Sequence, residues 1–129
     1  MTPEQIGERL REDPATAGLR LAVLHGSRAR GTAGAHSDWD IGVLAPDGDP
    51  DLAALTVAIT RLLGTDAVDV VDLATASALL RYRAARDGVP LLEGRAGEFQ
   101  EFQIAAAQFW CDAGPVIRAA QDDVLAGLG

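Results

Sequence analysis

Two short motifs near the start of the chain combine residue types that bind phosphate and metal ions. Gly26-Ser27 is followed, after ten intervening residues, by Asp38-Trp39-Asp40. Glycine lets a phosphate approach the backbone closely, and a serine hydroxyl can bind its oxygens. Carboxylates are hard oxygen ligands that suit Mg²⁺ or Mn²⁺. The combination therefore indicates metal-dependent chemistry on a nucleoside triphosphate.

The two aspartates stand at the start of an apolar run that predicts a buried strand, from Asp38 to Leu44. Successive side chains of a strand face opposite sides, so Asp38 and Asp40 share one face and Trp39 and Ile41 the other. Two carboxylates on one face repel each other unless a cation lies between them. A bare Asp-x-Asp also fits a solvated strand end, so its significance depends on the neighbouring motif.

The phosphate-binding candidate follows a second short apolar strand, predicted for Leu21–Leu24. A strand followed by glycine, a hydroxyl and helix-compatible residues predicts a turn whose backbone N–H groups point outward at a helix N-terminus, where anions bind. Arg28 and Arg30 add guanidinium groups that match phosphate oxygens. Gly-Ser turns and surface arginines are also common without any such role.

A third acid is needed for a two-metal site, and Asp69 and Asp72 are the candidates. Asp69 lies among β-branched residues in an expected interior strand, where an unpaired charge is costly and calls for a purpose. Asp72 faces the other way near the next helix and fits a loop or capping residue. We therefore favour Asp69.

These motifs resemble the signature of the DNA polymerase β nucleotidyltransferase superfamily. The run from His25 to Leu44, with Val68–Leu73 and Arg81–Glu93, is more closely similar to the minimal nucleotidyltransferases, the MNT antitoxins that pair with HEPN toxins. The resemblance covers roughly residues 19–93. It implies an α+β fold with a small mixed sheet flanked by helices, and transfer of AMP from ATP to a tyrosine of the cognate HEPN ribonuclease.

The resemblance also implies a role for each motif residue. Gly26 and Ser27 would hold the β- and γ-phosphates, with help from Arg28 and Arg30. Two Mg²⁺ ions, or Mn²⁺, would bind at the carboxylates, Asp38 and Asp40 contacting both ions and Asp69 the catalytic one. The predicted catalytic and metal-binding residues are thus Asp38, Asp40 and Asp69.

The length and net charge of the chain restrict the class of molecule that could accept the nucleotide. With 129 residues the chain is expected to form one domain, with its motif core at about residues 19–93 and C-terminal helices at about 96–128. This leaves no room for a separate acceptor-binding domain. The net charge of −8 argues against a nucleic-acid surface. A protein acceptor is the expectation.

Composition excludes further classes of chemistry. All eleven basic residues are arginines, so lysine nucleophiles and P-loops are excluded. Cys111 is a single cysteine and suits buried packing, and no zinc site is expected. Neither a signal peptide nor a membrane span is predicted, which favours the cytoplasm.

The remaining elements are expected from local patterns. Thr2, Pro3 and Gln5 predict a capped helix to about Glu12, and Pro90 places a strand at Val89–Leu92 on a sheet edge. His25 is expected to be packed with its hydrogen bonds satisfied, and His36 is expected to be solvated. Phe109 and Trp110 are adjacent, so one of them is a candidate for an exposed partner contact. Further helices are expected at 51–63, 76–86 and 98–112, with a last one from Pro115 that places Ile117, Ala120, Val124 and Leu128 on one face.

Three functions remain open from the sequence. The first is an enzyme that adenylylates a partner protein, and the second is an antitoxin that inhibits its toxin by binding alone. The third is a small-molecule nucleotidyltransferase of the antibiotic-modifying kind, which would normally carry an additional helical domain. The complete set of motif residues favours the first.

Overall fold

The computed structural model describes residues 1–34 and 36–128, with side chains described in residues 1–34 and 36–113. Four strands form one sheet in the order β3-β2-β1-β4. Strand β1 pairs antiparallel with both β2 and β4, whereas β2 and β3 are parallel. The predicted α+β fold with a small mixed sheet is confirmed. Its elements are α1 (Pro3–Glu12), the short 3₁₀ helix η1 (Pro14–Thr16), β1 (Leu21–His25), α2 (Ser27–Arg30), β2 (Trp39–Leu44), α3 (Leu52–Leu63), β3 (Val68–Asp72), α4 (Ala78–Asp87), β4 (Val89–Glu93) and α5 (Glu98–Leu128).

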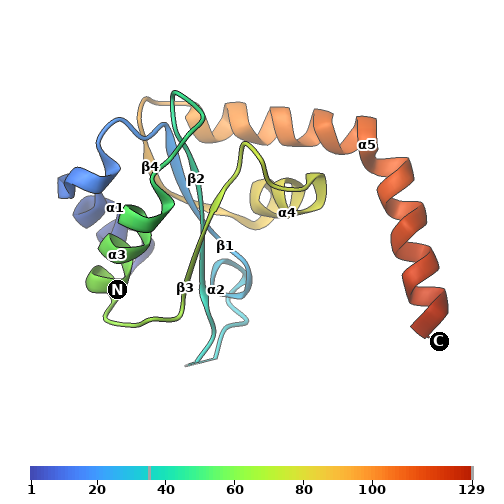
Figure 1. Cartoon of the computed structure of the whole chain (residues 1–129), viewed down its shortest axis with the longest axis horizontal. Helices are drawn as coiled ribbons and strands as arrows, with labels where there is room; N and C mark the ends of the chain where they lie inside the picture. The colour runs from blue at the N-terminus through green and yellow to red at the C-terminus, as the bar shows by residue number, and fades with distance from the viewer. Residues whose placement is uncertain (35, 129) are drawn as a thin grey trace.

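Helices cover the sheet on both faces, α1 and α3 on one and α4 and α5 on the other (Figure 1). On the first face, Ile6, Leu10, Leu55 and Ile59 pack against strand residues such as Ile41. On the second face, Ala84, Ala85, Phe102 and Ala106 pack on Leu21 and Val23. Alternation along β1 assigns its odd-numbered residues to the α4/α5 face. His25 therefore lies on the α4/α5 face, at the far end of the strand.

Local signals set the ends of several elements as predicted. The Thr2 hydroxyl accepts a hydrogen bond from the Gln5 backbone N–H, and the Gln5 side chain accepts one from the Thr2 backbone N–H. This is the expected capping box. Strand β4 is an edge strand, as Pro90 predicted. Helix α4 begins after a Ser77 cap, two residues later than expected.

Two expectations for the C-terminal region are not met by the structure. Cys111 is exposed on α5, so the prediction that it packs in the interior is wrong. The prediction that a separate helix begins at Pro115 is wrong, because α5 continues through this residue to Leu128, and the predicted apolar face of that segment falls outside the described side chains.

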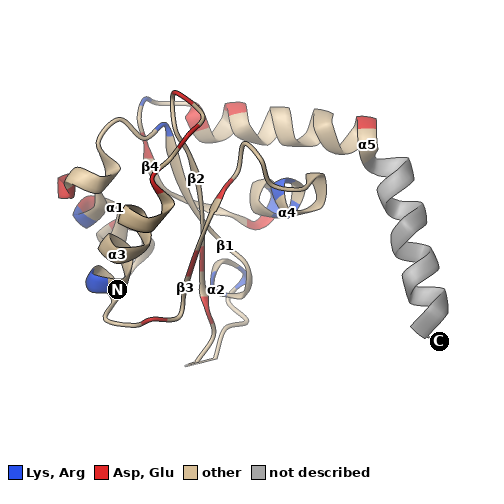
Figure 2. Cartoon of the chain, in the orientation of Figure 1, with Lys and Arg blue, Asp and Glu red and all other residues tan. Residues whose placement is uncertain are grey.

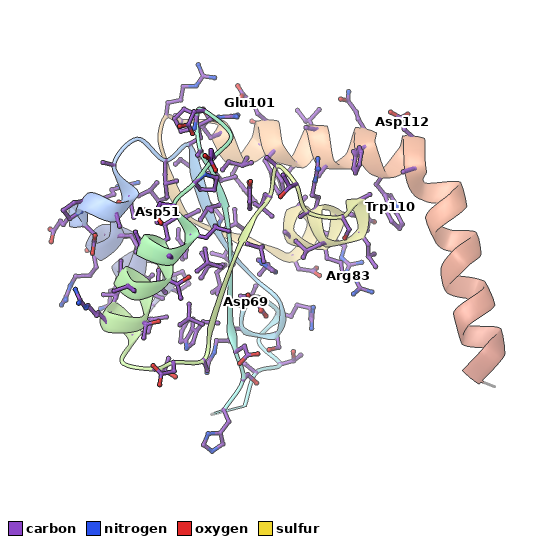
Figure 3. All side chains as sticks on the ribbon, viewed as in Figure 1. Asp51, Asp69, Arg83, Glu101, Trp110 and Asp112 are labelled. Carbon is purple, nitrogen blue, oxygen red and sulfur yellow. The ribbon has the colours of Figure 1, made fainter. Side chains whose placement is uncertain are left out.

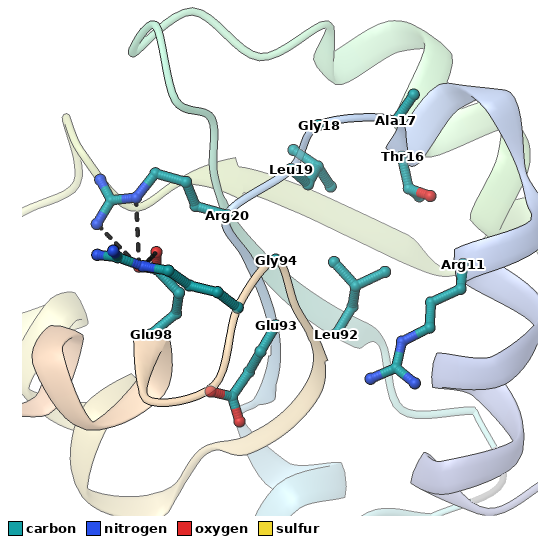
Figure 4. A pocket seen from close by; sticks show the side chains of 11 residues that line it. Arg11, Thr16, Ala17, Gly18, Leu19, Arg20, Leu92, Glu93, Gly94 and Glu98 are labelled. Carbon is teal, nitrogen blue, oxygen red and sulfur yellow. Dashed lines mark hydrogen bonds and ion pairs between the residues drawn. The ribbon is translucent and has the colours of Figure 1, made fainter.

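Ion pairs to the buried Glu98 carboxylate hold the start of α5 against Arg20, directly before β1, at the end of the sheet remote from His25. The Glu98 side chain is 5% exposed and lies 3.0 Å from both Arg20 Nη2 and Arg95 Nε. These residues line a pocket that also contains Arg11 and Glu93 (Figure 4). The Glu93 carboxylate accepts hydrogen bonds from the backbone N–H groups of Gly97 and Phe99 and so provides partners for N–H groups at the start of α5. This pocket belongs to the scaffold, because its acidic groups already have partners.

Among the described residues, no helix combines the length and the apolar character that a membrane crossing requires.

Candidate active site

Three titratable side chains form a row across three adjacent strands. His25 of β1 is in register with Asp40 of β2, and Asp40 is in register with Asp69 of β3. Residues that are directly opposite in a sheet point to the same face, so all three lie on the α4/α5 face. The α4/α5 layer reaches this face only as far as Val23, against which Gly88 packs. The row therefore lies beyond the α4/α5 layer, at an end of the sheet where Asp69 is exposed and His25 and Asp40 are half-buried, which we refer to as the uncovered end.

Gly26 is in direct contact with the central carboxylate of this row. A Cβ on Gly26 would lie 2.2 Å from Asp40 Oδ2, so only glycine leaves space for the carboxylate. Gly26 also has a φ of +71°, which side-chain-bearing residues rarely adopt. The two parts of the sequence motif thus form one site, because the Asp40 side chain occupies the space that a side chain at Gly26 would need.

The two motif arginines have different environments. Arg28 donates from Nε (3.1 Å) and Nη2 (2.9 Å) to the Ser37 carbonyl, and its guanidinium lies 4.1 Å from the centroid of the Trp39 ring. Arg28 therefore ties α2 to the residues that precede β2. Arg30 is exposed, and its positive charge lowers the pKa of the Asp40 carboxyl. Arg30 is the freer of the two to meet a phosphate.

Burial dominates the electrostatics of the row. It raises the pKa of Asp40, as do, more weakly, the neighbouring carboxylates of Asp69 and Asp38. Burial also lowers the pKa of His25, although Asp40 and Asp69 act in the opposite direction. The His25 Nε2 atom is buried without a hydrogen-bond partner. The histidine is packed, as expected, but the expectation that its hydrogen bonds are satisfied is wrong for Nε2. The sequence also did not indicate that its neighbours are the acidic residues.

The structure corrects the reason for preferring Asp69. Strand β3 is an edge strand, not an interior one, and Asp69 is exposed. Burial therefore does not single it out, whereas its register with Asp40 does. Asp72 accepts a hydrogen bond from the Ala74 N–H at 2.9 Å, which is the turn role expected for it. Asp38 is exposed just before β2 begins.

The acidic residues fit a divalent cation that is completed by a substrate. No group of three or more His, Cys, Asp or Glu side chains in the described part of the chain is arranged to hold a metal ion. Mg²⁺ usually binds one or two carboxylates together with substrate phosphates and water, and not an all-protein cage. Asp40 and Asp69 supply two carboxylates on one face, and burial together with their mutual repulsion already raises the pKa of Asp40.

The end of α4 also borders this site, which the sequence did not reveal. Both Arg30 and Arg83 lower the pKa of the Asp87 carboxyl through their charge, after the larger effect of the hydrogen bonds from Arg86. The charge of Arg30 thus acts on Asp87 as well as on Asp40. Figure 2 shows the acidic segments of β2 and β3 alongside the basic residues of α2 and α4. In the sequence, the arginines at positions 81, 83 and 86 indicated that basic side chains gather on this helix.

Comparisons with known proteins agree with this geometry. A protein adenylyltransferase, MntA, from Aphanizomenon flos-aquae (strain 2012/KM1/D3) is 36% identical over 96 residues. The match covers 66% of this chain and 64% of that relative, so it spans slightly less than two thirds of the relative's length.

Solved structures are similar over almost the whole chain. A toxin–antitoxin structure with AMP-PNP has a TM-score of 0.77 at 29% identity, covering 97% of this chain and 99% of that chain. A mutant form of the toxin–antitoxin MntA-HpeT has a TM-score of 0.78 at 28% identity, with the same coverage.

The family model described as polymerase beta, nucleotidyltransferase matches residues 4–95, which include the glycine turn, the row of His25, Asp40 and Asp69, and the end of α4. The chain belongs to the polymerase beta nucleotidyltransferase family.

Proposed function

We propose that this chain transfers AMP from ATP to a tyrosine of a cognate HEPN-family toxin and thereby neutralises that toxin. The observation that carries the proposal is the in-register pair of Asp40 and Asp69 beside the Gly26 turn. The proposed phosphate-binding turn and the proposed metal-binding carboxylates would then act together at one end of the sheet. A single domain of residues 1–129 would do this in the cytoplasm, where ATP is available.

Similar proteins support the same reaction. The MntA relative is a protein adenylyltransferase, and a structure similar over 97% of this chain is a toxin–antitoxin with AMP-PNP. ATP as substrate and a toxin as acceptor are consistent with both. The net charge of −8 supports a protein acceptor over a nucleic acid, because phosphate backbones require basic surfaces.

The nucleotide would lie across the glycine turn. Gly26 lets a phosphate approach the backbone, and the Ser27 hydroxyl would bind the β- and γ-phosphates. Arg30 would contribute its exposed guanidinium to the triphosphate. Arg28 would act mainly by holding the Ser37 segment in place, because two of its donors are already bound to the Ser37 carbonyl.

Mg²⁺, or Mn²⁺ in its place, would be held by Asp38, Asp40 and Asp69 together with the phosphates of ATP. Bound there, the ions would supply Lewis-acid neutralisation of the triphosphate charge. Asp40 would be fully ionised in this complex, because a cation offsets the burial and the repulsion that raise its pKa.

The transfer exchanges one phosphorus–oxygen bond for another. The tyrosine oxygen forms a bond to the α-phosphorus while the bond from the α-phosphorus to the bridging oxygen breaks and pyrophosphate leaves. The tyrosine proton passes to the Asp69 carboxylate, which is exposed at the edge of the site and accessible to an acceptor.

Intact mass spectrometry tests this function. The purified chain is incubated with ATP, Mg²⁺ and a HEPN-family partner, beside an Asp38→Asn/Asp40→Asn variant. Mass added to the partner in AMP steps, and absent with the variant, is the expected result. A tight complex without any mass shift would instead make the chain a binding antitoxin. Modification of an aminoglycoside but not of the protein would favour a small-molecule enzyme.

A further inference from the structure

Helix α4 and the first half of α5 bring arginine and aromatic side chains together. Tyr82 stacks on Trp110 with ring centroids 5.0 Å apart and an interplanar angle of 21°. The Arg81 guanidinium lies 4.5 Å from the Phe109 ring centroid, and that of Arg86 lies 5.6 Å from the Tyr82 ring centroid. With the neighbouring Arg83, these residues form what we refer to as the arginine–aromatic surface: Arg81, Tyr82, Arg83, Arg86, Phe109 and Trp110. Figure 3 labels Arg83 and Trp110, which lie on the side of the molecule away from α1 and α3.

Much of this surface is accessible, although α5 is already well anchored on α4. Phe102 and Ala106 are buried in the contact between the helices, and the Gln103 side chain donates to the Ala85 carbonyl. Phe109 nevertheless remains 40% exposed and the Arg86 side chain 54% exposed. Tyrosine, tryptophan and arginine are the residue types that contribute most to protein interfaces.

The charge of the surface indicates an acidic occupant. Helix α4 contains three arginines and one aspartate, a net charge of +2, in a chain whose net charge is −8. Arg83 is exposed, and no hydrogen bond or ion pair engages it within the described residues. Glu101 lines a pocket together with Arg81, and Asp87 pairs with Arg86, so acidic side chains limit the basic area and a long phosphate backbone would meet repulsion there. A protein segment that carries one or two carboxylates fits this pattern.

The surface is continuous with the candidate active site. A Cβ on Gly88, directly after α4, would lie 2.5 Å from Val23 Cγ1, and Val23 is two residues before His25 on the same sheet face. Arg83 and Arg30 both act on Asp87, and Arg30 also acts on Asp40. A protein bound on α4 and α5 would therefore reach the carboxylates of β2 and β3 without crossing to the other face.

We propose that the arginine–aromatic surface docks the acceptor protein, by pairing an acidic segment of the acceptor with Arg83 and packing an apolar side chain on Phe109. This inference rests on the proposed function, since its occupant is the protein that receives AMP. Docking there orients the acceptor so that its hydroxyl enters the uncovered end of the sheet.

Charge reversal at Arg83 tests the proposal with little risk to the fold, because that side chain makes no hydrogen bond or ion pair in the described structure. Arg83→Glu and Arg83→Glu/Phe109→Ser are compared with wild type and with Arg9→Glu/Arg61→Glu, which reverses two exposed arginines on α1 and α3. Isothermal titration calorimetry measures the Kd for a purified HEPN-family partner, and separately for an ATP analogue with Mg²⁺. Circular dichroism confirms that each variant is folded.

We expect Arg83→Glu to weaken partner binding at least about tenfold and the double variant further, while the α1/α3 control stays within about twofold. Binding of the ATP analogue should be unchanged in all variants. Wild-type affinity in both Arg83 variants, with AMP transfer intact, would overturn the docking surface and leave the proposed function standing. Absence of both binding and AMP transfer in the wild-type chain would overturn the proposed function and this inference together. If the Arg83 variants lose affinity for a single-stranded RNA but keep wild-type affinity for the partner protein, the docking surface is also overturned.

Discussion

Asp40 and Asp69 lie directly opposite each other on the parallel strands β2 and β3, with side chains on the same face of the sheet. This register brings together two acids that are 29 residues apart in the chain. Gly26 abuts the Asp40 carboxylate from the other side. The site therefore depends on strand pairing as much as on the motif residues themselves.

Asp40→Asn should stabilise the metal-free protein at neutral pH. Burial and neighbouring carboxylates raise the pKa of Asp40, so its ionised form destabilises the folded state above that pKa. We expect a melting temperature higher by a few degrees at pH 7, with the difference disappearing below the ordinary pKa of 3.8, where the carboxyl is protonated in both states. Differential scanning fluorimetry with and without Mg²⁺ measures both this gain and the loss of stabilisation by Mg²⁺.

Asp112→Asn, at an exposed position on α5, is the control for a change of charge alone. A metal-free Asp40→Asn protein less stable than wild type would contradict the electrostatic account of the site.

Gly26→Ala should impair the site more than Gly31→Ala. Both glycines have positive φ, +71° and +76°. Gly31 is in the left-handed helical region, where alanine costs about 1–2 kcal/mol, whereas Gly26 has a ψ of −156°, in a region essentially restricted to glycine, so its backbone strain is larger. Only at Gly26 would the new Cβ collide with Asp40, since nothing lies within 4 Å of it at Gly31. Urea unfolding should show an additional loss of about 1–3 kcal/mol for Gly26→Ala, and AMP transfer should fall sharply only in this variant. Equal effects of the two substitutions would mean that the contact with Asp40 is unimportant.

His25 should make stability depend on pH in the mildly acidic range. Burial lowers its pKa in the folded state, so the unfolded chain takes up a proton near the ordinary value of 6.5 while the folded chain does not. Stability should thus be complete above pH 6.5 and decline as the pH falls toward the folded pKa. His25→Leu should flatten this decline in urea unfolding at a series of pH values. His36→Leu, at an exposed site, should leave the wild-type profile unchanged; a flattened profile there would reassign the titration.

Arg28→Lys should reduce the stability of the fold, whereas Arg30→Lys should weaken the binding of ATP. Lysine keeps the charge of Arg28 but cannot reproduce its two bonds to the Ser37 carbonyl or its stacking on Trp39. We expect Arg28→Lys to lose about 1–2 kcal/mol of stability. Arg30→Lys should remain within about 0.5 kcal/mol of wild type but raise the KM for ATP. Denaturant unfolding and steady-state kinetics separate the two, and a destabilised Arg30→Lys protein would refute this division of roles.

Glu98→Gln should reduce stability without affecting the site. The pKa of Glu98 is lowered mainly by its hydrogen bond from Arg20, so its contribution is present above the ordinary value of 4.5 and is lost as the pH falls through the folded pKa. The melting temperature should drop at pH 7, and the gap should close in acid. Glu101→Gln, 57% exposed, is the matched control. Impaired ATP binding in Glu98→Gln would instead link its pocket to the chemistry.

Elements defined by short-range patterns were predictable from the sequence. The capping box of Thr2 and Gln5, the edge position of the strand with Pro90, and the face shared by Trp39 and Ile41 depend on neighbours within a few residues. Cap hydrogen bonds and strand alternation are local, so residue type and spacing suffice to indicate them. The spacing from Gly26 to Asp40 likewise indicated the family, because it belongs to one continuous segment of the chain.

Tertiary structure alone decided which distant residues meet. Asp69 was preferred for an interior position that it does not have, and its real distinction is the register with Asp40. The packing of Arg28 on Trp39 and the nearness of Asp87 to Arg30 were equally invisible in the sequence. Register and helix placement follow from burial of two apolar faces at once, which is a property of the whole chain. The sequence by itself determined the chemistry available to this protein, and long-range packing decided where that chemistry is assembled.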